Sequence, residues 1–265
     1  MKKFLVIGNP IQHSLSPKLH NFWFKKYGFF DHVYEKKEIV EKDLINITQD
    51  IKNDVISGIN ITVPFKRSII QFCDEVDKTS EITQSVNTVT KKRGKLVGHN
   101  TDCEAFKESI RSYKTDTVFI LGSGGVTASI IDALHSTSKI FLSNRTKKKA
   151  NDLRDQFKKE RLGNIEVLEW GSKPTVICDL VINTTSVGLK DNDEIPINFN
   201  DYSGKKVLFV DLIYNQKTNF LKEAEKRGNQ IMDGKEMFLR QARYAFKIWT
   251  NILPALDKDT LNLLK

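Results

Sequence analysis

Short apolar runs alternate with stretches of helical periodicity along the chain. In its N-terminal part the runs predict four strands, at Phe4–Ile7, Tyr34–Glu38, Gly58–Thr62 and Val86–Thr90. The stretches between them predict helices over residues 16–27, 41–52 and 66–72. Strands that alternate with helices favour a mainly parallel sheet covered by helices, which is an α/β fold.

A second series of strands and helices begins at Val118. Its predicted strands are Val118–Leu121, Ile140–Ser143, Ile165–Leu168, Leu180–Asn183 and Val207–Asp211. A helix from Asp102 to Ser112 is predicted to connect the two series, and a long amphipathic helix is predicted from Glu236 to Ile252. We therefore predict two α/β domains around a cleft, one made of residues 1–101 and 237–265 and the other of residues 102–236.

A glycine-rich turn lies between the first strand and the first helix of the second series. Gly122-Ser123-Gly124-Gly125 follows Val118–Leu121 and precedes a helical stretch that starts at Val126. Glycines let a backbone approach phosphates, and the free N–H groups of a first helical turn attract an anion. The turn predicts a pyrophosphate site, although Thr127 breaks the strict G-x-G-x-x-G pattern and leaves a ligand-free tight turn as the alternative.

The end of the next strand predicts which dinucleotide binds. A carboxylate about 20 residues after the glycine turn would bind the 2′-hydroxyl of NAD. This chain instead has Asn144-Arg145-Thr146-Lys147, and Arg145 suits the 2′-phosphate of NADP. Lys148 and Lys149 are expected to be solvent-exposed.

Polar residues gather at the predicted strand ends of the first domain. Ser14 and Ser16 precede Pro17, and two hydroxyls beside a helix N-terminus favour a carboxylate site; the alternative for Ser16 is a plain N-cap. Lys66 is expected at a helix start, where the helix dipole disfavours a cation, so its position suggests a role other than helix stability.

Three asparagines, Asn60, Asn87 and Asn100, stand at three successive predicted strand ends, and Asp102 follows the last of them. One asparagine at such a place is more often a turn former than a ligand, but three indicate a polar site. Taken alone, Lys66 would be a surface lysine and Asp102 a helix cap. Together they offer a proton and an oriented donor for the reduction of a ketone.

Composition narrows the classes of function. The 265 residues carry a net charge of +9, which favours anionic ligands, but the lysines are scattered and do not form a nucleic-acid patch. The odd number of cysteines argues against a disulfide scaffold, and the five histidines (His13, His20, His32, His99 and His135) lack metal-ligand spacing, so no metal is expected. The apolar run at Phe4–Ile7 is too short for a signal peptide, and no run is long enough to span a membrane, so a cytoplasmic protein is expected.

These motifs together resemble the shikimate dehydrogenase family over nearly the whole chain. The resemblance rests on segments that occur in the family's order, namely Asn9-Pro10-Ile11, Ser14-x-Ser16-Pro17, Asn60-x-Thr62-x-Pro64-x-Lys66, Val86-Asn87-Thr88, Asn100-Thr101-Asp102, the glycine turn, Asn144-Arg145-Thr146, and Gln241. It implies NADPH-dependent reduction of 3-dehydroshikimate to shikimate, in a monomer or homodimer with a substrate domain (residues 1–101 and 237–265) and a Rossmann-like NADP domain (residues 102–236).

The resemblance also implies roles for single residues. Lys66 and Asp102 would be the catalytic pair. The substrate would be bound by Ser14, Ser16, Asn60, Thr62, Asn87, Tyr214 and Gln241. The cofactor would be bound by Gly122, Ser123, Gly124, Gly125, Val126, Asn144, Arg145, Thr146, Lys147, Thr184, Thr185, Ser186 and Gly234.

The chain departs from the family pattern at a few places. Gln84-Ser85 stands where the family usually has Gly-Ala, and Cys103-Glu104-Ala105 lacks a common glycine. Three alternatives remain: a relative that prefers quinate or NAD, an idle NADP-binding sensor, and a nucleic-acid-binding module. Arg145 argues against NAD, the presence of both Lys66 and Asp102 argues against a sensor, and only the net charge favours a nucleic-acid-binding module.

Overall fold

The computed structural model describes residues 1–134, 138–159, 164–188, 190 and 193–264. The chain divides into two compact units, one of residues 1–105 and 239–265 and the other of residues 106–238. Among the described residues, no helix combines the length and the apolar character needed to cross a bilayer.

The first unit contains a six-stranded sheet. Its strands are β1 (Lys2–Gly8), β2 (His32–Glu38), β3 (Gly58–Ile61), β4 (Glu75–Val76), β5 (Thr88–Lys92) and β6 (Lys95–His99). They lie in the order β2-β1-β3-β5-β6-β4. Strand β1 pairs in parallel with β2 and β3, and β4 pairs in parallel with β6, whereas β5 runs antiparallel to both of its neighbours. The expected mainly parallel sheet is confirmed, with one reversed strand inside it.

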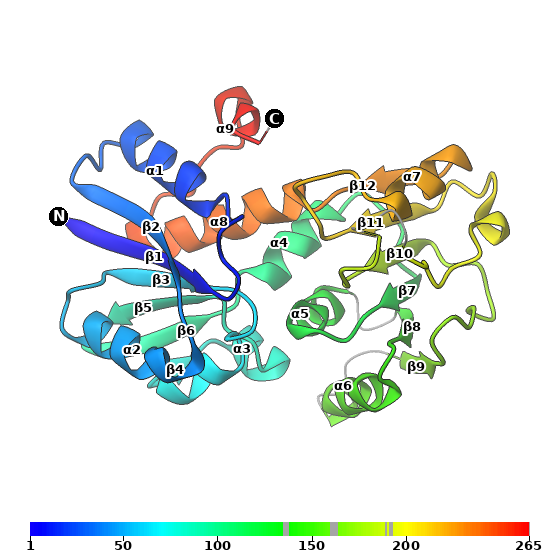
Figure 1. Ribbon diagram of the computed structural model, residues 1–265, viewed down its shortest axis with the longest axis horizontal. Helices are drawn as coiled ribbons and strands as arrows, with labels where there is room; N and C mark the ends of the chain where they lie inside the picture. The colour runs from blue at the N-terminus through cyan, green and yellow to red at the C-terminus, as the bar shows by residue number, and fades with distance from the viewer. Residues whose placement is uncertain (135–137, 160–163, 189, 191–192, 265) are drawn as a thin grey trace. The chain divides into compact units, whose positions relative to one another are not determined.

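Helices cover both faces of this sheet, α1 and α8 on one face and α2 on the other (Figure 1). The helical segments that belong wholly or partly to this unit are α1 (Ser16–Lys26), η1 (Glu41–Asp43), α2 (Leu44–Lys52), η2 (Ser68–Phe72), α3 (Lys78–Thr83), α4 (Asp102–Ser109), α8 (Lys235–Thr250) and α9 (Lys258–Asn262).

Strand β1 explains why the sheet needs two coverings. Successive side chains of a strand point to opposite faces. Leu5 and Ile7 join an aliphatic core with Ile47 and Ile51 of α2, whereas Phe4 packs against Phe24 of α1. The unbroken apolar run therefore marks a strand that is buried on both faces.

An aromatic cluster fills the face under α1 and α8. Phe246 and Trp249 of α8 contact the rings of Trp23, Tyr34 and His20 at centroid distances of 5.4–6.1 Å. The last helix of the chain thus completes a core that is otherwise built by its first residues.

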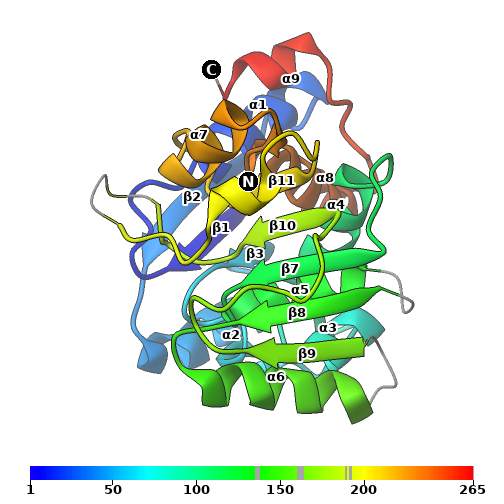
Figure 2. The same cartoon turned by 90° about the vertical axis from the view of Figure 1, so that its right-hand side faces the viewer.

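The second unit has the doubly wound arrangement. Its strands are β7 (Thr117–Leu121), β8 (Lys139–Ser143), β9 (Asn164–Leu168), β10 (Leu180–Asn183), β11 (Leu208–Asp211) and β12 (Gln230–Met232), and its further helical segments are α5 (Gly125–Ala133), α6 (Lys147–Lys159), η3 (Phe199–Tyr202) and α7 (Asn219–Lys226). The strands lie in the order β12-β11-β10-β7-β8-β9, of which β11 to β9 can be followed in Figure 2, and the pairings are parallel. Counted from β7, this is the Rossmann order, whose ligand site lies where the order reverses, at the carboxyl ends of β7 and β10.

Two local expectations were wrong. The predicted strand at Val86–Thr90 begins at Thr88, so Val86 and Asn87 precede it. The predicted helix over residues 66–72 is a 3₁₀-helix that starts at Ser68, and Lys66 lies in the turn before it. The helix-dipole argument for Lys66 therefore does not apply, and its position must be explained by its side-chain partner.

Candidate active site

The reversed strand β5 brings the polar residues of the first unit to one edge of the sheet. Thr88, the first residue of β5, lies opposite Asn60 of β3 on one side and His99, the last residue of β6, on the other. Asn87 directly precedes Thr88, and Asn100 directly follows His99. An antiparallel strand starts where its neighbours end, so Asn60, Asn87 and Asn100 meet although Asn87 stands at a strand start.

Lys66 and Asp102 form a nearly buried ion pair at this edge. The Lys66 ammonium lies 2.6 Å from Oδ2 of Asp102, and their side chains are 15% and 6% exposed. An ammonium has three hydrogens, and Asp102 is its only hydrogen-bond partner among the described residues. The backbone is fixed as well, because the carbonyl of Lys66 accepts a hydrogen bond from the N–H of Val86 at 2.8 Å.

The carboxylate of Asp102 does not cap its helix, although Asp102 is the first residue of α4. Its Oδ2 accepts from Lys66, and its Oδ1 accepts from Nδ2 of Asn87 at 2.9 Å. Oδ1 of Asn87 accepts from the N–H of Thr101 at 3.0 Å. The amide of Asn87 therefore holds both the carboxylate and the turn that carries it, which disfavours the helix-cap alternative for Asp102.

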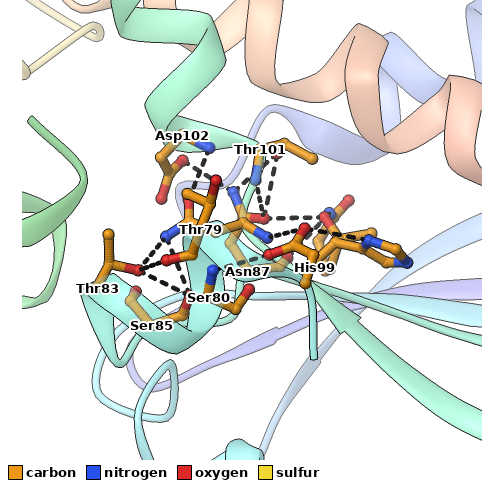
Figure 3. Close-up of polar contacts among 12 residues, drawn as sticks. Thr79, Ser80, Thr83, Ser85, Asn87, His99, Thr101 and Asp102 are labelled. Carbon is orange, nitrogen blue, oxygen red and sulfur yellow. Dashed lines mark hydrogen bonds and ion pairs between the residues drawn. The ribbon is translucent and has the colours of Figure 1, made fainter. Parts of the chain in front are cut away.

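A second set of bonds fixes the turn before α4 (Figure 3). Oδ1 of Asn100 accepts from the N–H of Asp102 at 3.0 Å, and Nδ2 of Asn100 donates to Oγ1 of Thr83 at 3.0 Å. Asp77, the N-cap of α3, accepts from the N–H of Asn100 at 3.3 Å and lies 3.2 Å from Nδ1 of His99. These bonds preorganise the carboxylate, because the turn that carries Asp102 is held by Asn100, Thr83 and Asp77.

The two predicted carboxylate-binding serines lie at the start of α1. Oγ of Ser14 accepts from the N–H of Ser16 at 3.4 Å. Ser16 is buried and is the first helical residue, with Leu15 at the N-cap and no side-chain cap there. Because Ser16 is not the N-cap residue, a plain N-cap does not explain this serine.

Three further residues with an expected substrate role are Thr62, Gln241 and Tyr214. Thr62 directly follows β3, is half-buried, and donates its N–H to the carbonyl of Ile7 at 2.9 Å. Gln241 lies in α8 and belongs to the first unit, whereas Tyr214 belongs to the second unit, where its ring stacks on Phe238 at 4.7 Å.

In the second unit, the glycine turn has the geometry of a phosphate cradle. Gly122 has φ +108°, and a Cβ there would lie 2.4 Å from Oγ1 of Thr184, so only glycine fits. A Cβ at Gly124 or Gly125 would meet open space, which leaves room for a ligand against the first turn of α5. Oγ of Ser123 is buried and has no hydrogen-bond partner among the described residues. These residues fit a dinucleotide pyrophosphate.

Thr127 stands at the third position of the glycine pattern and makes a hydroxyl contact there. Its Oγ1 lies 2.8 Å from Oγ1 of Thr184, which donates to the carbonyl of Leu121 at 2.7 Å. A hydroxyl pair thus replaces the glycine contact that usually packs helix against strand at this position.

The residues after β8 fit a phosphate ester. Arg145 is exposed, and no ion pair is found for it within the described residues. Nδ2 of Asn144 donates to the carbonyl of Thr146 at 2.9 Å, which shapes the turn. Lys147, also expected at the cofactor, forms an ion pair with Glu169, and Lys148 pairs with Asp152.

The loop after β10 is anchored by a buried carboxylate that the sequence did not reveal. Oδ2 of Asp211 accepts from Nδ2 of Asn183 at 3.1 Å and from Oγ1 of Thr218 at 2.7 Å. Burial raises the pKa of Asp211. Oδ1 of Asn183 accepts from the N–H of Thr185 at 3.0 Å, so this network shapes the segment that contains Thr184, Thr185 and Ser186.

Gly234, expected near the cofactor, lies against the chain that follows β11. Its N–H donates to the carbonyl of Ile213 at 3.0 Å, and a Cβ there would lie 2.1 Å from the carbonyl oxygen of Leu212. The described residues contain no cluster of three or more metal-ligating side chains; His135 lies outside them.

Comparisons with known proteins agree with this geometry. Residues 6–89 match the model of the shikimate dehydrogenase substrate binding domain, and residues 104–212 match that of shikimate / quinate 5-dehydrogenase. The chain is 48% identical to the shikimate dehydrogenase (NADP(+)) of Pelagibacter ubique, over 99% of this chain and 98% of that protein.

Solved structures show the same fold. A crystal structure of shikimate dehydrogenase from Aquifex aeolicus superposes with a TM-score of 0.88 at 35% identity, covering 100% of this chain and 98% of that one. The enzyme from Thermus thermophilus, solved with NADP(H) and shikimate, has a TM-score of 0.86 at 28% identity, with coverage of 100% and 97%. The chain therefore belongs to the shikimate dehydrogenase family of NADP-dependent oxidoreductases.

Proposed function

We propose that this chain catalyses the reversible reduction of 3-dehydroshikimate to shikimate by NADPH, in the pathway to chorismate and the aromatic amino acids. The observation that carries the proposal is the nearly buried pair of Lys66 and Asp102, 2.6 Å apart, in the unit that matches the family's substrate-binding model. The relatives named for NADP(+) and for shikimate support the choice of cofactor and substrate.

Lys66 acts as the proton donor of the reaction. Bound NADPH would supply the hydride to the carbonyl carbon. The Lys66 ammonium stabilises the negative charge that develops on the carbonyl oxygen, and then transfers a proton to it. Asp102 orients the ammonium and helps the lysine to regain its proton from solvent. In the reverse direction Lys66 accepts the proton of the hydroxyl group.

Ser14 and Ser16 hold the substrate carboxylate, with Tyr214 near it, and the ring hydroxyls are contacted by Asn60, Thr62, Asn87 and Gln241. Both N–H groups of the Asn60 side chain already have protein partners, so a ring hydroxyl reaches this residue by donating to the second lone pair of Oδ1. Both N–H groups of the Asn87 side chain also have protein partners, Thr101 and Asp102. A ring hydroxyl can therefore accept a hydrogen bond from Asn87 only if the bond to Thr101 is broken.

The second unit holds the cofactor. Gly122, Ser123, Gly124, Gly125 and Val126 surround the pyrophosphate. Thr184, Thr185, Ser186 and Gly234 flank the nicotinamide, and Asn144, Arg145 and Thr146 bind the 2′-phosphate. Lys147 adds its charge at the edge of this site while it is paired with Glu169.

Residues 1–101 with 237–265 then form the substrate and catalytic domain, and residues 102–236 form the NADP domain. We place the enzyme in the cytoplasm, as a monomer or a homodimer. Cys73, Cys103 and Cys178 form no disulfide within the described residues, which supports a reducing compartment.

One assay tests the function. Purified protein should oxidise NADPH when 3-dehydroshikimate is added, and in the reverse direction shikimate with NADP⁺ should be preferred over quinate and over NAD⁺. Preference for quinate or for NAD⁺ would reassign the substrate or the cofactor. Inactivity with all of these substrates would refute the proposal.

The catalytic pair is tested by replacing its members. Lys66→Ala should lower kcat by roughly 10²–10⁴-fold while NADPH still binds, because the residues of the cofactor site are unchanged. The double variant with Asp102→Ala should lose much less than the product of the two single losses, as members of one unit do. Lys95→Ala is the control, because Lys95 forms an exposed ion pair with Glu75. Near-normal kcat in Lys66→Ala would mean that the proton comes from another group.

A further inference from the structure

A row of buried hydrogen bonds starts at a tyrosine that belongs to none of the expected roles. The hydroxyl of Tyr34 donates to Oδ1 of Asn60 at 2.7 Å. Nδ2 of Asn60 donates to Oγ1 of Thr88 at 2.9 Å, and that hydroxyl lies 3.0 Å from Oδ1 of Asn87. All of these side chains are buried.

The same row continues to the charged pair. Nδ2 of Asn87 donates to Oδ1 of Asp102 at 2.9 Å, and Oδ2 of Asp102 accepts from Lys66 at 2.6 Å. Side-chain hydrogen bonds thus join the phenol of Tyr34 to the ammonium of Lys66 without a gap.

The row has one direction. Nδ2 of Asn60 donates to the backbone carbonyl of Asn87 at 3.1 Å, so the oxygen of this amide faces Tyr34, whose hydroxyl donates to it. Oδ1 of Asn87 accepts from the backbone N–H of Thr101, and its nitrogen faces the Asp102 carboxylate, so the hydroxyl of Thr88 donates to that oxygen. Among the described residues, Tyr34 is the only partner of the Asn60 oxygen, and Thr88 joins the two amides.

Tyr34 is held in place from two sides. Its ring stacks on the imidazole of His20, with centroids 4.3 Å apart and an interplanar angle of 3°. Its hydroxyl is held by Asn60, and burial raises the pKa of the phenol well above its usual range, so it stays protonated as a donor.

We propose that Tyr34 and Thr88 are positioning residues: their hydroxyls complete the hydrogen bonding of the Asn60 and Asn87 amides and so hold the Asp102 carboxylate in the geometry that Lys66 needs. The inference rests on the proposed catalytic role of Lys66 and Asp102.

Single hydroxyl deletions test the proposal. Tyr34→Phe keeps the ring on His20, and Thr88→Val keeps the shape of the side chain, but each leaves a buried amide atom without its partner. Each should lower kcat with shikimate by about tenfold, the effect of losing one such partner, and leave the Kd of NADPH unchanged. Thr88→Ser retains the hydroxyl and should keep most of the activity.

Tyr27→Phe is the matched control, because the Tyr27 hydroxyl accepts only a bond from the N–H of Ala255, outside the row, among the described contacts. Melting temperatures of all variants verify that they are folded. If Tyr34→Phe and Thr88→Val keep kcat within twofold of the parent enzyme, or if Thr88→Ser loses as much as Thr88→Val, the proposal is overturned.

A double-mutant cycle separates positioning from a general structural role. Once Asp102→Asn has removed the charge that the row serves, adding Tyr34→Phe should lower kcat no further. Losses that multiply would mean that Tyr34 acts independently of Asp102, and would overturn the proposal. Full activity of Asp102→Asn alone would instead refute the proposed catalytic pair, so the two failures are distinguishable.

Discussion

At the scale of single residues, hydrogen bonds from Asn87 and Lys66 hold the carboxylate of Asp102 before a substrate arrives. Lys66 and Asp102 were expected from the sequence as a pair, and the structure brings them to 2.6 Å. The hydrogen-bonding roles of Tyr34, Thr88 and Asp211 were not expected. For the first two, the reason is that a buried tyrosine or threonine in a strand has the same apolar pattern whether or not its hydroxyl has a partner. Only the three-dimensional contacts distinguish the two cases.

His20 offers a residue-scale prediction about pH. Its ring is fully buried, neither ring nitrogen has a hydrogen-bond partner among the described residues, and burial lowers its pKa to about 3. The unfolded chain binds a proton on His20 below its ordinary pKa of about 6.5, whereas the folded chain does not, so its contribution to stability is present above pH 6.5 and is lost as the pH falls toward 3.

His20→Phe removes this dependence while keeping a ring beside Tyr34. The difference in unfolding free energy between the parent protein and His20→Phe should be constant above about pH 7 and should shrink by about 2 kcal/mol between pH 6.5 and pH 5. Urea denaturation at several pH values measures it. A difference that does not vary with pH would mean that His20 can take up a proton in the folded protein.

Arg145 offers a residue-scale prediction about the cofactor. It is exposed beside the proposed 2′-phosphate site, and the described residues provide no acidic partner for it. Arg145→Ala should weaken NADP⁺ binding by roughly 1.5–3 kcal/mol, as the loss of one charge-assisted contact does, and should leave the KM for NAD⁺ nearly unchanged. Equal losses for both cofactors, measured by steady-state kinetics, would contradict the assignment.

At the scale of elements, five strands of the second unit were predicted to within one residue, but β12 and α7 were not predicted. Strands β5 and β6 are joined by the two-residue turn Arg93-Gly94, with φ of 52° and 79°. Such a hairpin turn favours Asn-Gly or Asp-Gly, and an arginine with positive φ gives no such signal. A strand at Val86–Thr90 was predicted, but β6 was missed, and with it the antiparallel direction of β5 that brings Asn87 to the site.

The end of α3 provides an element-scale prediction. Gln84, which stands where the family usually has glycine, adopts the left-handed conformation with φ 50° at the C-cap of this helix. Gln84→Gly should raise the free energy of unfolding by about 1 kcal/mol, because glycine adopts this conformation without a Cβ clash.

Gln84→Ala is the matched control for that substitution. It also removes the bond from Nε2 of Gln84 to the carbonyl of Glu81, but it retains the strained Cβ. Chemical denaturation should therefore rank the glycine variant above both the parent and the alanine variant. Equal stabilities of the two variants would show that backbone strain at this position has no measurable cost.

At the scale of the whole molecule, the alternation of apolar runs was sufficient to predict two α/β units, because inner parallel strands such as β1, β7 and β10 are buried on both faces and so carry a continuous apolar run. The pairing order of the strands was not predictable in the same way. Strand order depends on contacts between segments far apart in sequence, such as Trp249 with Phe4, whose rings lie 4.9 Å apart.

The return of α8 to the first unit has a consequence for biosynthesis. On the ribosome, residues 1–105 emerge first, but Phe246 and Trp249, which complete their aromatic core, are added only after the whole of residues 106–238. At ordinary translation speeds this delay is roughly ten to thirty seconds. The contiguous second unit is therefore able to fold during synthesis, whereas the first segment must wait with one face of its sheet covered by α1 alone, in the interval when a nascent chain most needs a chaperone.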